Sequence, residues 1–132
     1  MRLNDIKKAF LASAALLSAM SMSAAERFVS FQQGDLLING NDKVEIYMDA
    51  NDCRGVSYAA NALVKDIRNV SGSQATITSN RKATILVGTI GHSAAIDQLV
   101  KQKRINGNLL KGKREKFIIT VVDNQLVIAG SD

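Results

Sequence analysis

Two aspartates are the first residues in this sequence whose type and spacing suggest chemistry. Asp49 and Asp52 follow an apolar run that ends at Met48, and catalytic carboxylates often lie where a strand ends. Two carboxylates could act as the acid and base of glycoside hydrolysis. Aspartates three residues apart in one loop are equally suited to capping a helix and forming a turn. We expect capping and turn formation to explain both.

His92 is the only histidine and Cys53 the only cysteine. A small hydrolase could use His92 as an acid or base with Asp49 or Asp52. A thiol with a lowered pKa could act as a nucleophile, but no base is evident beside Cys53. One His and one Cys cannot complete the coordination of zinc, and one Cys cannot form a disulfide within the chain. We predict no metal, no cofactor and no catalytic residue here, and place both side chains in loops.

The segment Gly88-Thr89-Ile90-Gly91-His92-Ser93 lies between a predicted strand and a predicted helix. The backbone N–H groups of such a loop can hold an anion. Its glycine spacing, however, matches neither a phosphate-binding loop nor a dinucleotide fingerprint. We interpret it as a tight turn from strand to helix.

A basic cluster lies within residues 101–116. Such a cluster could bind nucleic acid or attract an anionic polysaccharide. No aromatic residues are interleaved for base stacking, and the export predicted below separates the chain from nucleic acid. We interpret the segment as a solvated connector, with an acidic polysaccharide as the alternative partner. The cluster consists of Lys101, Lys103, Arg104, Lys111, Lys113, Arg114 and Lys116.

The length and composition limit what can position these residues. A chain of 132 residues is enough for one domain and too short for a barrel enzyme, which needs roughly 200 residues. With 46% hydrophobic and 22% charged residues and a net charge of +5, the composition is that of a folded domain and excludes a disordered chain.

The first 25 residues have the pattern of a secretory signal peptide. Arg2, Lys7 and Lys8 precede an apolar stretch at 9–19, which is too short to span a bilayer. Small residues follow at 23–25, as a cleavage site requires. The alternative is a buried N-terminal helix. The signal predicts a bacterial protein that is exported to the periplasm or secreted, and that is not held at the membrane after cleavage.

Cleavage would leave a mature domain of residues 26–132. Its 14 Lys and Arg against 11 Asp and Glu give a net charge of +3. Apolar periodicity divides it into strands and helices. Strands are predicted at 27–31, 44–48, 75–78, 84–87, 116–122 and 125–129, with 36–38 as a further, very short one, and helices at 54–70 and from Ser93, as its N-cap, to about 100. In the strand at 44–48, Val44, Ile46 and Met48 are expected on one face and Glu45 and Tyr47 on the other, and the strand at 84–87 is expected to be buried on both faces.

Local signals mark the ends of these elements. Asp52 is a plausible N-cap or first-turn acid for the first helix, and Gly72 a C-terminal stop. Asp123-Asn124 suits a tight hairpin turn. Ala95, Ile96, Leu99 and Val100 are expected on the inner side of the second helix. The first helix is expected to bury one apolar stripe, formed by Val56, Ala59, Ala60, Leu63, Ile67 and Val70.

The order of elements predicts an α+β domain, a mixed β-sheet of five to six strands with two helices packed on it. Two helices would leave part of such a sheet uncovered. Gly130-Ser131-Asp132 is a typical transition from a strand to the N-cap of a helix. We therefore expect the domain to be incomplete at its C-terminus, a fragment of a longer chain. The alternative is a natural end on the edge of a hairpin.

Several stretches together resemble the N-terminal region of glycoside hydrolase family 115, the xylan α-1,2-glucuronidases. The resemblance covers nearly the whole predicted mature chain, and the order and spacing of the stretches agree. The stretches are Val44–Asp49 with Asn51-Asp52 and Gly55-Val56, Ala62–Val70 with Gly72, Ile85–Gly91, Ile96–Val100, Lys111-Gly112-Lys113 with Glu115 and Phe117, and Val121–Asn124 with Leu126–Asp132.

The resemblance implies a parent enzyme that removes 4-O-methyl-glucuronic or glucuronic acid from xylan by acid/base hydrolysis with inversion. It also implies that residues 26–132 are the small α/β accessory domain preceding the catalytic barrel, as in hexosaminidases. The family's catalytic acids lie in that barrel, and no position here matches them. The leading expectation is a non-catalytic domain, inactive alone, whose partners are the barrel and, through it, glucuronoxylan. The alternative is a self-contained periplasmic binding module for an acidic polysaccharide.

Overall fold

The computed structural model describes Leu36, Ile38 and residues 42–132. The predicted signal peptide and the predicted strand at 27–31 lie outside the described residues, and neither Leu36 nor Ile38 is in a strand. The elements are, in chain order, β1 (Lys43–Tyr47), α2 (Arg54–Ser71), β2 (Gln74–Thr78), β3 (Ile85–Thr89), α3 (Ala94–Lys101), the short 3-10 helix η2 (Gly107–Leu109), β4 (Phe117–Val122) and β5 (Gln125–Gly130).

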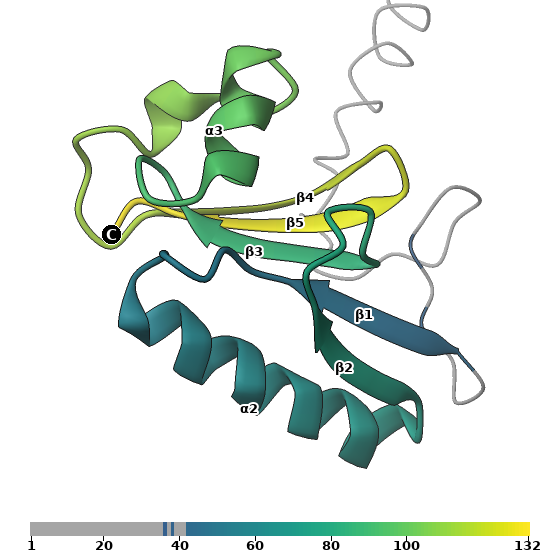
Figure 1. Cartoon of the computed structure of the whole chain (residues 1–132). Coiled ribbons are helices and arrows are strands. Elements are labelled where there is room, and N and C mark those ends of the chain that lie inside the picture. The colour runs from purple at the N-terminus through teal and green to yellow at the C-terminus, as the bar shows by residue number, and fades with distance from the viewer. Residues whose placement is uncertain (1–35, 37, 39–41) are drawn as a thin grey trace, which may run out of the picture. The chain divides into compact units, whose positions relative to one another are not determined.

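The described strands form one mixed sheet in the order β2-β1-β3-β5-β4. β2, β1, β3 and β5 run parallel, and β4 pairs antiparallel with β5 at one edge. Figure 1 shows α2 and α3 on opposite faces of the sheet. The predicted class, a mixed sheet of five to six strands with two helices packed on it, is confirmed, since the structure has five strands and two α-helices in its described part.

Alternation along the strands creates two cores, one on each face of the sheet. In β1, Val44 and Ile46 pack with α2, whereas Tyr47 packs in the cluster that includes α3. In β3, Ile85 faces α2 and Leu86 faces α3, and all five residues of this strand are buried, as predicted. We call the two sides the α2-side face and the α3-side face.

Helix α2 begins at Arg54 and ends before Gly72, as the sequence predicts, but its N-cap and part of its buried face differ from the prediction. Gly72 has a φ of +73°, a left-handed conformation that glycine adopts readily, and it closes the helix. The N-cap is Cys53 rather than Asp52, and Cys53 makes no side-chain cap hydrogen bond. The prediction that Asp52 caps this helix is therefore wrong, because its carboxylate is used elsewhere.

The apolar stripe of α2 agrees with the predicted one only in part. Four of its predicted members pack in the core on this face, namely Val56, Ala60, Leu63 and Ile67. Ala60 and Val64 are the buried residues of the helix, whereas Ala59 and Val70 are exposed. At 3.6 residues per turn, positions 59 and 70 both lie about a quarter turn from Ala60. They therefore point to the side of the face that contacts the sheet.

The β4–β5 hairpin turns at Asp123-Asn124, as predicted. Both residues have positive φ, 50° and 62°, which matches the right-handed twist of the flanking strands. Helix α3 is capped by Ser93, whose Oγ accepts a hydrogen bond from Ile96 N, also as predicted. No helix in the described part of the chain is both long and apolar enough to cross a bilayer.

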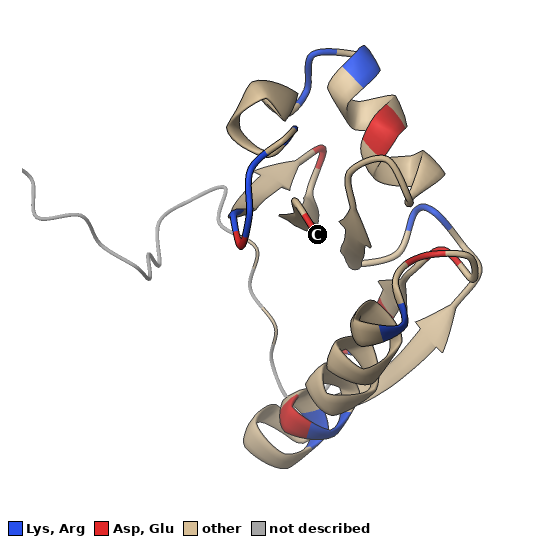
Figure 2. Ribbon diagram, turned by 90° about the vertical axis from the view of Figure 1, so that its left-hand side faces the viewer, with Lys and Arg blue, Asp and Glu red and all other residues tan. Residues whose placement is uncertain are grey.

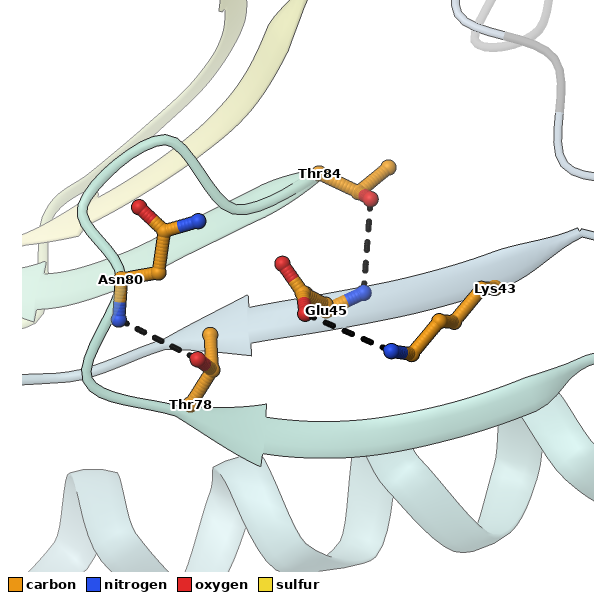
Figure 3. Close-up of polar contacts among 5 residues, drawn as sticks. All are labelled: Lys43, Glu45, Thr78, Asn80 and Thr84. Atoms are coloured by element: carbon orange, nitrogen blue, oxygen red, sulfur yellow. Dashed lines mark hydrogen bonds and ion pairs between the residues drawn. The ribbon is translucent and has the colours of Figure 1, made fainter.

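Side chains extend the pairing of β1 where the strand ladder ends. β1 and β3 pair only at Ile46–Ile85 and Tyr47–Leu86. One residue earlier, Glu45 N donates instead to Thr84 Oγ1 at 3.3 Å (Figure 3). The hydroxyl thus replaces a backbone acceptor at the start of β3, so this hydrogen bond maintains the register that places the ends of β1 and β3 side by side.

Candidate functional site

The loops that follow β1 and β3 meet at one edge of the sheet. The chain leaves β1 toward α2 on one face and leaves β3 toward α3 on the other. In open parallel sheets, ligands bind outside the carboxyl ends of the strands at such a switch point. The predicted candidates Asp49, Asp52 and the Gly88–Ser93 segment are brought together here, although no spacing rule placed them in contact.

Asp49 joins the end of β1 to the beginning of α3. Its Oδ2 accepts hydrogen bonds from Ser93 Oγ at 2.6 Å and from Ala95 N at 3.3 Å. Its Oδ1 accepts a hydrogen bond from Tyr47 Oη at 2.6 Å. The carboxylate therefore caps α3 from outside the helix, where a negative charge is favoured.

Asp52 holds the turn after β1 against the end of β3. Its Oδ2 accepts a hydrogen bond from Thr89 N at 2.9 Å, and its Oδ1 accepts one from Cys53 N at 2.6 Å. Its own N–H donates to the carbonyl oxygen of Asp49 at 3.2 Å. The contacts thus give Asp49 a capping role, at α3, and Asp52 a role in holding the turn, but neither aspartate caps α2.

The environment of Asp49 stabilises its charged form. Burial acts to raise the pKa of Asp49, but hydrogen bonds from Ser93, Tyr47 and Ala95 and the charge of Arg81 outweigh it, and the pKa lies below its usual value. Burial, followed by the hydrogen bond to Asp49, raises the pKa of Tyr47. A carboxylate held ionised by fixed donors is suited to a structural role rather than to donating a proton.

The contribution of Tyr47 and Arg81 is the part of this site that sequence reasoning missed. Arg81 Nε donates to Tyr47 Oη at 3.3 Å, and the guanidinium lies 5.9 Å from the centre of the tyrosine ring. The two residues are 34 positions apart. The alternation in β1 indicated that Tyr47 faces away from Val44 and Ile46, but nothing in the sequence indicated its partner.

The Gly88–Ser93 segment is the tight turn that the sequence predicted. A Cβ added at Gly88 would lie 2.6 Å from Ser93 Cβ and 3.0 Å from Asp52 Oδ2. Glycine is therefore required here by the close approach of the two loops. Gly91 N donates to Asp97 Oδ1 at 2.8 Å, so the first turn of α3 uses this N–H internally instead of offering it to an anion.

His92 and Cys53 lie near this edge without joining the carboxylate contacts. His92 is exposed, and none of the hydrogen bonds to Asp49 or Asp52 comes from it. Cys53 is half-buried. Over residues 42–132, no group of three or more His, Cys, Asp or Glu residues is arranged to hold a metal ion. The structure thus does not bring His92 into hydrogen-bonding contact with Asp49 or Asp52, as a hydrolase that uses these residues would require.

The predicted basic cluster is exposed and follows α3. Figure 2 shows the basic positions along the connector from α3 to β4. An open hollow of about 720 Å³ lies here, and its lining includes Lys103, Arg104 and Lys111, the polar residues Asn106 and Asn108, and the apolar residues Ile90, Val100 and Ile105. Arg104 pairs with Asp123, which lies in the β4–β5 turn. Within the hollow, Lys103 and Lys111 are therefore the cations without an ion pair in the described part of the chain.

Comparison with known proteins shows a similarity to a solved enzyme structure. No protein-family model matches this sequence, and no curated protein matches it. Among solved structures, the chain is similar to a family GH115 4-O-methyl-α-glucuronidase with specificity for decorated arabinogalactans, at 32% identity and a TM-score of 0.61. The match covers 70% of this chain and 12% of that enzyme. The chain thus has the fold of one small part of a family GH115 enzyme.

Proposed function

We propose that this chain is a non-catalytic accessory domain of an exported glycoside hydrolase that removes glucuronic or 4-O-methyl-glucuronic acid side groups from a plant polysaccharide. The observation that carries the proposal is the similarity to a family GH115 glucuronidase over 70% of this chain but only 12% of that enzyme. Because the match covers so small a part of that enzyme, it supports the hypothesis that this domain is an accessory module and that its partner is a separate catalytic barrel. The sequence analysis expected the domain to precede that barrel.

The contacts at the switch point support a structural rather than a catalytic role. Both oxygens of Asp49 and both oxygens of Asp52 accept hydrogen bonds from the protein itself. A general acid or base needs an oxygen within reach of the substrate, and here those positions are taken by Tyr47, Ser93 and backbone N–H groups. The domain would therefore contribute stability and shape to the enzyme and leave the chemistry to the barrel.

Two polymers are candidate substrates of the whole enzyme. The family resemblance implies glucuronoxylan, whereas the similar solved enzyme has specificity for decorated arabinogalactans. In either polymer, the side group that the whole enzyme would remove is glucuronic acid or its 4-O-methyl ether.

The test is an assay of the purified chain on both polymers. Oligosaccharides of glucuronoxylan and of decorated arabinogalactan are incubated with the 132-residue chain, and free 4-O-methyl-glucuronic acid is measured by chromatography. We expect no release above a mock purification from cells that carry an empty vector. Release that exceeds this control and is lost in the Asp49→Asn or His92→Ala variant would overturn the non-catalytic assignment.

The basic hollow supports a second candidate, a binding module for an acidic polysaccharide. Lys103 and Lys111 would attract a uronic acid carboxylate, and Asn106 and Asn108 would bind sugar hydroxyls. This hypothesis predicts binding to glucuronoxylan that weakens as salt rises. The variant Lys103→Glu with Lys111→Glu should lose it, whereas Lys113→Glu with Arg114→Glu, outside the hollow, should retain most of it. Equal loss in both pairs would indicate long-range attraction only.

A further inference from the structure

Strand β2 forms one edge of the sheet. It is the first strand in the sheet order, and among the described strands it pairs only with β1 (Figure 1). Its sequence, QATIT, contains no charged residue and no proline. A strand of this kind at an edge is a template on which another strand can pair. Such an edge therefore either receives a partner or needs a side chain that blocks it.

The backbone groups of Ala75 and Ile77 point outward from this edge. Gln74 N donates to the carbonyl oxygen of Asp42 at 3.2 Å, on the β1 side. Successive residues of a strand direct their N–H and C=O groups alternately to its two sides, so Thr76 also points to β1. The edge therefore directs two N–H and two C=O groups, those of Ala75 and Ile77, away from the sheet.

Arg68, in the last turn of α2, occupies one of these four groups. Its Nε and one of its Nη atoms both donate to the carbonyl oxygen of Ala75, at 2.9 and 2.6 Å. Because the guanidinium is planar and presents its donors as a rigid fork, it lies along the edge where an incoming strand would pair. Charged side chains at an edge are a common means of preventing such pairing.

A second copy of β2 fits this edge in one register. In an antiparallel pair related by a two-fold axis, Thr76 would lie opposite Thr76 of the second copy, and Ala75 opposite Ile77. Residues that form a hydrogen-bonded antiparallel pair exchange both of their N–H···O bonds. This register would therefore satisfy every outward backbone group of the two strands, provided that Ala75 is free to pair.

The side chains of β2 also permit this pairing. Ala75 and Ile77 lie on the α2-side face, opposite Val44 and Ile46 of β1. Ile77 is 40% exposed, so it can cover the small Ala75 of the second copy. The obstacle is Arg68, because each copy would have to release its carbonyl oxygen and two like charges would meet at the joined edge.

We propose that the outer edge of β2 is a strand-pairing surface for a second copy of this chain, and that Arg68 keeps this surface closed. The inference goes beyond the proposed function and does not depend on it. It gives Arg68 a role that a surface cation of a helix does not otherwise have, since this side chain holds the domain in a single copy.

Sedimentation equilibrium of the 132-residue chain tests the inference. Arg68→Ala opens the edge, and alanine preserves helix propensity. Lys65→Ala is the matched control, because Lys65 lies on the same helix and lines the same hollow of about 330 Å³ beside β2. It removes an equal charge, but within the described residues Lys65 makes no hydrogen bond to the edge. Concentrations extend to about 1 mM, since a contact through one short strand is weak.

We expect Arg68→Ala to dimerise with a dissociation constant at least about 10-fold lower than that of the wild type or of Lys65→Ala, because pairing no longer breaks a charged hydrogen bond in each copy. Arg68→Lys keeps the charge without the fork of donors and should shift the constant less. Adding Ile77→Pro to Arg68→Ala removes an outward N–H at an edge, where proline is tolerated, and should restore the monomer.

Hydrogen exchange measured by NMR locates the contact. In the wild-type monomer, the amides of Ala75 and Ile77 should exchange quickly and that of Thr76 slowly. In Arg68→Ala, both outward amides should gain at least about 10-fold protection as the protein concentration rises. Protection of these amides in the wild-type monomer would overturn the inference, because another segment would then occupy the edge.

Two sedimentation results would also overturn it. One is an Arg68→Ala variant that retains the circular dichroism of the wild type and stays as monomeric. The other is a Lys65→Ala variant that dimerises as strongly as Arg68→Ala, which would assign the effect to charge and not to the blocked carbonyl oxygen. If Arg68→Ala does not fold, Arg68→Lys replaces it, and dimerisation no stronger than in the wild type would contradict the role of Arg68.

Discussion

The α2-side face of the sheet is covered in one half and exposed in the other. Ile85 in β3 is 1% exposed, while Ile119 in β4, the same residue type on the same face, is 59% exposed. The difference follows from connectivity. The β1–α2–β2 crossover lays a helix across its own strands, whereas β4 and β5 are joined by a two-residue turn that carries no helix. Coverage in this domain therefore depends on how strands are connected and not on how apolar they are.

The largest expected difference in the free energy of unfolding is between the alanine variants of Ile85 and Ile119. Ile85→Ala should lower the free energy of unfolding of the 132-residue chain by about 2–5 kcal/mol, because it opens a cavity beneath α2. Ile119→Ala should change it by less than about 0.5 kcal/mol. Urea denaturation followed by circular dichroism measures both. Similar losses would mean that Ile119 is covered in the isolated chain and would remove the contrast.

The polar contacts that attach α3 to the opposite face of the sheet give the next effect. Asp49→Ala should cost about 2 kcal/mol, because Tyr47 Oη, Ser93 Oγ and Ala95 N lose their acceptor. Asp66→Ala, at an exposed position of α2, is the control and should be nearly neutral. The same denaturation assay applies. A neutral Asp49→Ala would show that α3 holds its place without this carboxylate.

Helix α2 offers a smaller version of the same contrast. Val64 is 8% exposed and Val70 is 89% exposed, although the sequence predicted Val70 on the buried stripe. Val64→Ala should cost about 1.5 kcal/mol, from the loss of two buried methyl groups, and Val70→Ala should cost almost nothing. Thermal unfolding monitored at 222 nm distinguishes them. The reverse order would restore the predicted stripe.

The pH dependence carried by Asp49 is the smallest expected effect. Its pKa is lower in the folded chain than its ordinary value, which for aspartate is about 3.9. The resulting stability is present above that pH and is lost as the pH falls through the folded pKa. The stability difference between wild type and Asp49→Asn should therefore narrow between pH 5 and the acid limit of folding. If the difference in stability between the two proteins stays constant with pH, the contribution of Asp49 to stability comes from packing and not from its charge.

Much of the fold could be predicted from local patterns. The strands at β1, β3, β4 and β5, the Ser93 cap, the stop at Gly72 and the turn at Asp123-Asn124 all follow from period and turn chemistry. The predictions failed where two patterns compete. Asp52 has the residue type of an N-cap, but its carboxylate accepts a hydrogen bond from Thr89 N, 37 residues away, and a long-range partner of that kind leaves no local signal.

The candidate site could be predicted only in its parts. The sequence placed Asp49 after one strand and Ser93 before a helix, each with a capping role. It could not indicate that Asp49 caps the helix that begins after Ser93, 44 positions later in the chain. That contact exists because β1 and β3 are neighbours in the sheet, and neighbour order depends on the crossover rather than on any segment alone.

Within the described residues, the sequence by itself determined the five strands and two α-helices, with ends correct to within two residues, and the apolar side of β1, because these depend on residue type and period. Only the tertiary structure decided the strand order, the contacts that occupy Asp49 and Asp52, and the half of the α2-side face that stays exposed. FIITVV in β4 and ILVGT in β3 are both apolar strands. On the α2-side face, β3 is buried because α2 crosses that half of the sheet, whereas Phe117, Ile119 and Val121 of β4 are exposed because no described element crosses the other half.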